Sequence, residues 1–82
     1  MNKLQLMGPE GHRELVWDPE KVEAQDPETV AVVAEAERLL NDAFARGHAV
    51  FRVEDPDQPA ERINKFDWTA PRTVVVPRLA GG

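Results

Sequence analysis

The sequence predicts an α+β domain in which a mixed sheet of four or five strands carries one helix packed on one face. Three observations predict this class. One long segment repeats apolar residues at helical spacing. Several short segments carry alternating or β-branched apolar residues bounded by glycine and proline. A chain of 82 residues without cysteine has room for a single small core. We therefore expect one domain over residues 1–77 and a flexible tail over residues 78–82.

The first predicted unit is a β-hairpin. Residues 4–7 alternate apolar and polar side chains, and the Gly-Pro-Glu-Gly of residues 8–11 is typical of a turn. Residues 12–17 then form the second strand of the pair. The polar residues that follow, 19–25, predict a linker between the hairpin and the next element.

The second unit is a long amphipathic helix. Asp26 is a helix-capping residue, and Pro27 and Glu28 suit the first turn of a helix. From there to Arg46 the apolar residues recur at helical spacing, and Gly47 stands where a left-handed C-cap residue is expected. The predicted core-facing stripe consists of Val32, Val33, Ala36, Leu39, Leu40, Ala43 and Phe44.

The remaining strands follow the helix. Residues 48–53 predict a strand, residues 54–59 contain two prolines and predict a loop, and residues 61–64 predict one short strand. The β-branched run Thr-Val-Val-Val at residues 73–76 is typical of a strand buried on both faces, and therefore central in its sheet. Pro77 lacks a backbone donor and ends regular pairing.

The element order is thus strand, strand, helix, strand, short strand, strand. A single amphipathic helix must cover one face of the sheet, and the last strand is most easily buried beside the first, in parallel. This is the β-grasp arrangement. The sheet face away from the helix would be the surface for a partner, and we expect Val50, Arg52 and Val74 on it.

Composition disfavours several classes of function. Without cysteine the chain has no disulfide, thiolate metal site or cysteine nucleophile, and its two histidines, His12 and His48, are far apart in sequence. A net charge of -5 repels nucleic acids. No apolar run approaches the ~20 residues of a membrane span, and no signal peptide is evident. We expect a cytoplasmic protein that binds neither membranes nor nucleic acid.

Candidate catalytic residues are equally scarce. Asp18 and Asp67 have no base, nucleophile or orienting group near them in sequence, so we expect no enzymatic activity, no cofactor and no metal. Trp17 and Trp68 are expected to pack in the core or at its rim rather than to form a binding platform.

The C-terminus resembles that of the ubiquitin superfamily. Residues 73–82, Thr-Val-Val-Val-Pro-Arg-Leu-Ala-Gly-Gly, are similar to the ubiquitin ending, where a hydrophobic strand runs into an Arg-Leu-x-Gly-Gly tail. They are also similar to small sulfur carriers, such as the small subunit of molybdopterin synthase, which end in a proline-containing strand followed by Ala-Gly-Gly. The Arg, Ala, Pro and Glu usage, with the Asp-Pro breaks, is similar to that of proteins from high-GC bacteria. Together with the ending, the resemblance points to bacterial ubiquitin-like proteins encoded beside their own enzymes.

This resemblance implies that the carboxylate of Gly82 is the reactive group. An activating enzyme would adenylate it, a conjugating enzyme would carry it as a cysteine thioester, and a lysine amine of a target protein would receive it. A deconjugating protease would reverse the step. Gly81 and Gly82 lack Cβ atoms and suit a narrow channel.

Other residues have roles only through this resemblance. The partner enzymes would recognise the tail residues Arg78, Leu79 and Ala80. Self-linked chains would use Lys3, Lys21 and Lys65.

Two alternatives remain open. A sulfur carrier would form a thiocarboxylate at its C-terminus; Pro77 and Ala80 favour this function, whereas Arg78 and Leu79 favour a modifier. A plain interaction module would have incidental glycines and would act through an apolar surface.

Overall fold

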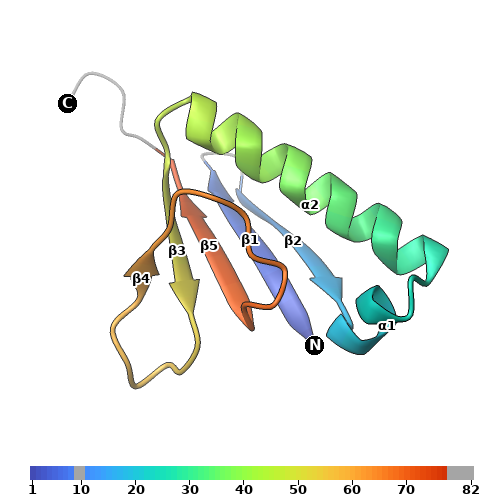
Figure 1. The fold of residues 1–82 in the computed structure, drawn as a ribbon. Helices are drawn as coiled ribbons and strands as arrows, with labels where there is room; N and C mark the ends of the chain where they lie inside the picture. Colours follow the sequence, from blue (N-terminus) through green and yellow to red (C-terminus); the bar gives the residue numbers. More distant parts are fainter. Residues whose placement is uncertain (9–10, 78–82) are drawn as a thin grey trace.

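The computed structural model, which describes residues 1–8 and 11–77, confirms an α+β fold with a five-stranded mixed sheet and a long helix packed on it (Figure 1). The elements in chain order are β1 (Asn2–Gly8), β2 (Gly11–Trp17), α1 (Pro19–Glu23), α2 (Pro27–Ala45), β3 (Ala49–Val53), β4 (Glu61–Arg62) and β5 (Arg72–Val76).

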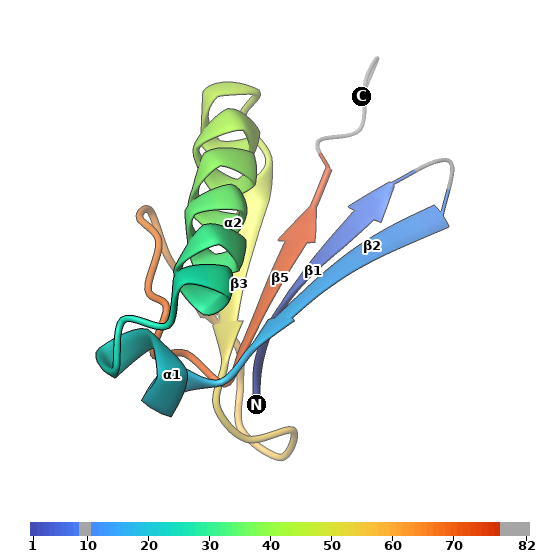
Figure 2. The same ribbon diagram turned by 90° about the vertical axis from the view of Figure 1, so that its right-hand side faces the viewer.

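The strand order across the sheet is β2-β1-β5-β3-β4. β1 is antiparallel to β2 and parallel to β5, while β3 is antiparallel to both β5 and β4. The predicted hairpin and the predicted central position of the last strand are therefore confirmed. Figure 2 shows β5 between β1 and β3, with both helices on one side of the sheet. β5 has a strand on each side, and its run of β-branched residues is typical of such a central strand.

The ends of α2 agree with the capping residues seen in the sequence. The carboxylate of Asp26 accepts hydrogen bonds from the backbone N–H of Thr29 (3.0 Å) and from its hydroxyl (2.7 Å). At the other end Gly47 has φ 77°, and the N–H of His48 donates to the carbonyl of Ala43 (2.9 Å), as in a Schellman motif. The helix thus begins and ends within a residue of the prediction.

The prediction of a linker over residues 19–25 is wrong. Most of that segment forms α1, whose first free N–H, that of Glu20, donates to the carboxylate of Asp18 (2.9 Å). Val22 packs against the core and gives this short helix an apolar anchor. The local signal was the same Asp-Pro-Glu sequence that starts α2, but five residues are too few to show helical periodicity.

β4 is also shorter than the predicted strand over residues 61–64. It covers only Glu61 and Arg62, opposite Arg52 and Phe51 of β3. The chain then turns away from the sheet edge after the N–H of Ile63 donates to the carbonyl of Val50 (3.0 Å).

The core lies between α2 and the sheet. The predicted helix stripe is confirmed, since three of its residues are buried and the other four pack around them. The fully buried apolar cluster consists of Leu4, Trp17, Ala36, Leu40, Ala43, Val50 and Val75. Trp17 lies with its ring centroid 6.0 Å from that of Phe66 at an interplanar angle of 59°, an arrangement that aromatic pairs favour.

A polar anchor holds the loop between β4 and β5 against this core. The carbonyl of Trp68 accepts hydrogen bonds from the side-chain amide of Asn2 (2.8 Å) and from the indole N–H of Trp17 (3.1 Å). Both donors belong to buried residues, so the carbonyl satisfies them where water cannot. Trp17 is buried and Trp68 half-buried, which confirms that both tryptophans serve packing.

Candidate functional site

The predicted reactive tail continues directly from β5. Gly81 and Gly82, as well as the predicted recognition residues Arg78, Leu79 and Ala80, lie outside the described residues. The described part ends at the base of the tail, where Val76 is opposite Ala49, the first residue of β3. The tail therefore starts from the central strand, at the end of the sheet where α2 ends and β3 begins.

The sheet face opposite α2 is covered by no element within residues 1–8 and 11–77 (Figure 2). β5 shows the alternation most clearly: Thr73 and Val75 are buried toward α2, whereas Val76 is 42% exposed. We call this surface the open face. The apolar residues that strand alternation places on it are Met7, Val16, Ala49, Phe51, Val53, Val74 and Val76.

Two of the three residues expected on the open face are not there. Val50 is 1% exposed and belongs to the core, and Arg52, two residues further along β3, lies on the same helix-facing side. Only Val74 is placed correctly. The alternation of β3 was visible in the sequence, and its more apolar face carries Ala49, Phe51 and Val53. The structure buries the other face, with Val50 and Arg52, because that face packs against α2.

The open face also carries a polar row across three strands. Arg72 of β5 donates from Nε to the amide oxygen of Gln5 on β1 (2.6 Å), and the amide nitrogen of Gln5 donates to the carboxylate of Glu14 on β2 (3.0 Å). Lys3 and Arg62 add positive charge to the same face, according to strand register. The open face is therefore cationic on balance, although the whole chain is acidic.

The three predicted acceptor lysines are not brought together. Lys3 is half-buried on the open face, Lys21 is exposed on α1, and Lys65 is exposed on the loop after β4. Their amines therefore present three separate surfaces to a partner enzyme.

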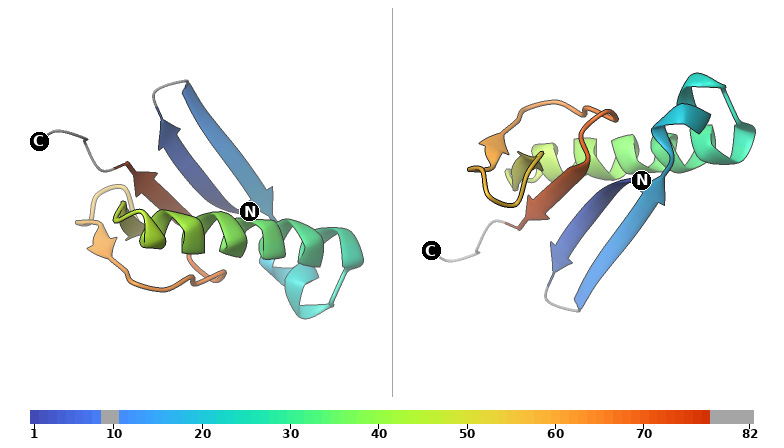
Figure 3. Two further views of the ribbon diagram at one scale, coloured as in Figure 1. Left: turned by 90° about the horizontal axis from the view of Figure 1, so that it is seen from above. Right: turned by 90° about the horizontal axis from the view of Figure 1, so that it is seen from below.

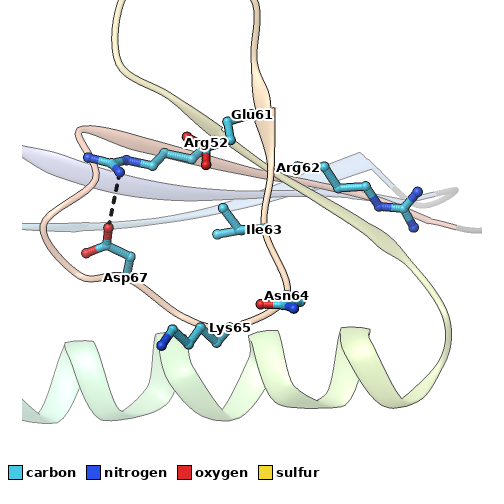
Figure 4. Close-up of a pocket in the computed structure, with 7 residues that line it drawn as sticks. All are labelled: Arg52, Glu61, Arg62, Ile63, Asn64, Lys65 and Asp67. Carbon is cyan, nitrogen blue, oxygen red and sulfur yellow. Dashed lines mark ion pairs between the residues drawn. The ribbon is translucent and has the colours of Figure 1, made fainter.

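A hollow of about 510 Å³ lies beside β4 and contains one of these lysines (Figure 4). Figure 4 shows the guanidinium of Arg52 directed at Asp67, with 3.6 Å between the paired atoms. Arg52 also pairs with Glu54 (2.5 Å), so its charge is neutralised within the chain. The residues lining the hollow are Arg52, Glu61, Arg62, Ile63, Asn64, Lys65 and Asp67.

The hollow supplies no evident catalytic set. Arg52 and Asp67 in its lining pair with each other, and neither His12 nor His48 lines it. Within the part of the chain that the structure describes, no three acidic or histidine side chains converge to hold a metal ion. The same residues include no helix with the length and apolarity needed to cross a bilayer.

Asp67 gives the loop above this hollow a pH-dependent anchor. The hydroxyl and backbone N–H of Thr69 donate to its carboxylate, and these bonds, with a smaller contribution from Arg52, hold the pKa of Asp67 below its ordinary value. A lowered folded-state pKa stabilises the fold fully above the unfolded pKa of about 3.9, and the contribution is lost as pH falls through the folded pKa.

We therefore expect Asp67→Asn to lower the melting temperature at neutral pH and to have a much smaller effect at about pH 3. Thermal unfolding followed by circular dichroism at both pH values measures the difference. Asp57→Asn, on an exposed loop residue, is the control and should be nearly neutral at both. An equal loss for Asp67→Asn at both pH values would contradict an ionised anchor.

The comparisons with known proteins add no relatives. No family model matches the chain, and neither a curated protein nor a solved structure matches it.

Proposed function

We propose that this chain is a ubiquitin-like protein modifier with a β-grasp fold, located in the cytoplasm. The observation that carries the proposal is the Arg-Leu-Ala-Gly-Gly ending, which follows directly on the strand that becomes β5. The architecture is compatible with a β-grasp, because a terminal strand lies between β1 and β3, parallel to β1, beneath one long helix.

The proposed chemistry takes place at the carboxylate of Gly82. A partner activating enzyme joins this carboxylate to AMP from ATP and releases pyrophosphate. A cysteine thiolate then displaces AMP and forms a thioester, and a target lysine amine displaces the thiolate and forms an amide. Because the chain has no cysteine, the cysteine that forms the thioester must belong to a partner enzyme. The chain contributes the acyl group and the surfaces by which partners hold it.

Two features of the fold support a carrier of this kind. The tail begins at a central strand, so its base is held by neighbours on both sides. The open face adjoins that base through Val76 and offers exposed apolar side chains to a partner. Residues far from the tail would then supply binding energy, and the tail itself needs only to reach the reacting centre.

A sulfur carrier is the second candidate, favoured by Pro77 and Ala80 just before the glycines. In that function sulfide-level sulfur from a partner donor would displace AMP from the adenylated carboxylate of Gly82 and leave a thiocarboxylate. Both candidates use the same residue and the same activation, and they differ in the final acceptor.

One experiment separates the candidates. An N-terminally tagged chain is purified under denaturing conditions from its own host, beside a Gly82 deletion, and both are examined by mass spectrometry. A modifier gives heavier species with lysine-linked remnants that the deletion lacks. A sulfur carrier gives one species in which sulfur replaces a carboxylate oxygen.

Asn41→Ala, at an exposed position on α2, is the matched control and should behave as the unaltered chain. If the unaltered chain and the deletion both remain unmodified while the host system is active, the proposed function is wrong. An interaction module acting through the open face would then be the better explanation.

A further inference from the structure

The two edges of the sheet differ in how they are protected. β4 forms one edge with only two residues, and the loop before it contains Pro56 and Pro59. β2 forms the other edge with seven residues, all paired to β1 without a bulge and none of them proline. Figure 3 shows β2 at the edge of the sheet in both views; α1 and the first part of α2 extend past its Trp17 end, but no described strand pairs with its outer side. Short strands, prolines, bulges and charged side chains protect an edge; β2 has none of the first three, and its charged side chains are Arg13 and Glu14.

The hydrogen bonds of β1 show which backbone groups of β2 face outward. The N–H of Lys3 donates to the carbonyl of Pro71, just before β5 (3.1 Å), so the backbone groups of Lys3 face β5. Alternate residues of β1 therefore face β2, where their partners are Arg13, Leu15 and Trp17. The backbone N–H and C=O groups that point to the outside are those of His12, Glu14 and Val16.

We propose that a second copy of this chain pairs with this edge, antiparallel, about a two-fold axis at Leu15. The pairing would join two five-stranded sheets into one of ten strands. An edge that offers unpaired backbone groups over a full strand is a template for another strand. A two-fold axis makes the same strand serve as both partners, so the register must be self-complementary.

Charge selects the register. The outward-facing backbone N–H and C=O groups of one copy must meet those of the other. A two-fold axis centred on Arg13, Glu14 or Leu15 satisfies this condition and still pairs at least five residues of β2 with the second copy. The first places two guanidinium groups opposite each other, and the second places two carboxylates opposite each other; like charges in these positions destabilise a sheet. The third places Leu15 opposite Leu15 of the second copy, and Glu14 opposite its Val16. Only this register avoids like charges while pairing five residues.

The pairing leaves the proposed modifier function intact and does not depend on it. β5, from which the tail continues, is separated from β2 by β1, and the open face stays uncovered. Each dimer would present two tails and two open faces.

The first test uses one position with opposite charges. In the proposed register Val16→Lys faces Glu14 of the second copy twice, whereas Val16→Glu places carboxylates opposite each other twice. We expect sedimentation equilibrium of the full chain to show a tighter dimer for Val16→Lys than for Val16→Glu, by about tenfold or more. The order of folding stability should be the opposite, because Val16 pairs with Lys3 on β1 of the same chain. Lys3 attracts the glutamate of Val16→Glu and repels the lysine of Val16→Lys. Melting temperatures therefore separate folding from pairing.

The second test uses the absence of cysteine. Leu15→Cys places two thiols opposite each other across the axis, within reach of a disulfide. Glu14→Cys is the control, because its two thiols would be offset by two residues and lie about 8 Å apart, beyond disulfide reach. We expect air oxidation to crosslink Leu15→Cys into a dimer and to leave Glu14→Cys largely monomeric.

Each contrary result overturns the proposal. If the chain remains monomeric at about 1 mM, the weak end of measurable affinity, a second copy is excluded as the partner of this edge. An extended segment of another protein would then be the better candidate. Equal dimer affinities of the two Val16 variants, or crosslinking through Glu14→Cys instead of Leu15→Cys, would exclude the Leu15 register. Since Leu15 is half-buried, the Val16 pair decides the question if Leu15→Cys does not fold.

Discussion

Replacing Trp17 by alanine is expected to lower the free energy of unfolding by about 3–5 kcal/mol. Trp17 is 2% exposed and is the largest fully buried side chain among the described residues. It contacts the core with its ring and holds the loop before β5 through its indole N–H. A domain of this size has a total stability on the order of 4–12 kcal/mol, so this loss is a large fraction of the total and should lower the melting temperature markedly.

Trp17→Phe is the matched variant, because it keeps an aromatic ring and removes the indole N–H. The carbonyl of Trp68 would retain its bond from Asn2, so we expect a loss of about 1–2 kcal/mol. Urea unfolding followed by tryptophan fluorescence, from Trp68, and by circular dichroism measures both variants. Losses of equal size would show that the hydrogen bond outweighs ring packing, against the expectation here.

Leu40→Ala should give the second large effect, a loss of about 2–5 kcal/mol. Leu40 is completely buried on α2 and belongs to the same core cluster as Val50 and Val75 of the sheet. Alanine suits a helix as well as leucine does, so the loss comes from removed apolar contact and from the cavity left behind.

Asn41→Ala is the control for this prediction, since it changes the next residue of the same helix at an exposed position. We expect its free energy of unfolding to lie within about 0.5 kcal/mol of the unaltered chain. Chemical denaturation of the two variants side by side makes the comparison. A loss below about 1 kcal/mol for Leu40→Ala would contradict its place at the centre of the core.

β5 is the described strand that the predicted reactive tail follows in the sequence. Its β-branched run predicted a central strand, and the structure places it between β1 and β3. The reactive residues themselves, Gly81 and Gly82, were identified from the sequence ending and its resemblance, and they lie outside the described residues. What the structure adds is the open face of the sheet, including Phe51 and Val53, which the sequence did not assign.

Local patterns in the sequence determined the helix, the hairpin and the central last strand. The helix of residues 27–45 follows from its apolar period and from its caps at Asp26 and Gly47, which act within a few residues. The same kind of local signal at Asp18 was present for α1 and was missed, because a five-residue helix shows no period. These features could be predicted since their causes lie close together along the chain.

Only the tertiary structure decided which face of β3 is buried and how the loop before β5 is held. Val50 and Phe51 are adjacent apolar residues whose side chains point to opposite faces of β3. Val50 is the buried one because its face packs against α2. The bonds to the carbonyl of Trp68 come from Asn2 and Trp17, 66 and 51 residues away in sequence. No local pattern reports such distant partners, because their approach results from the packing of the whole sheet.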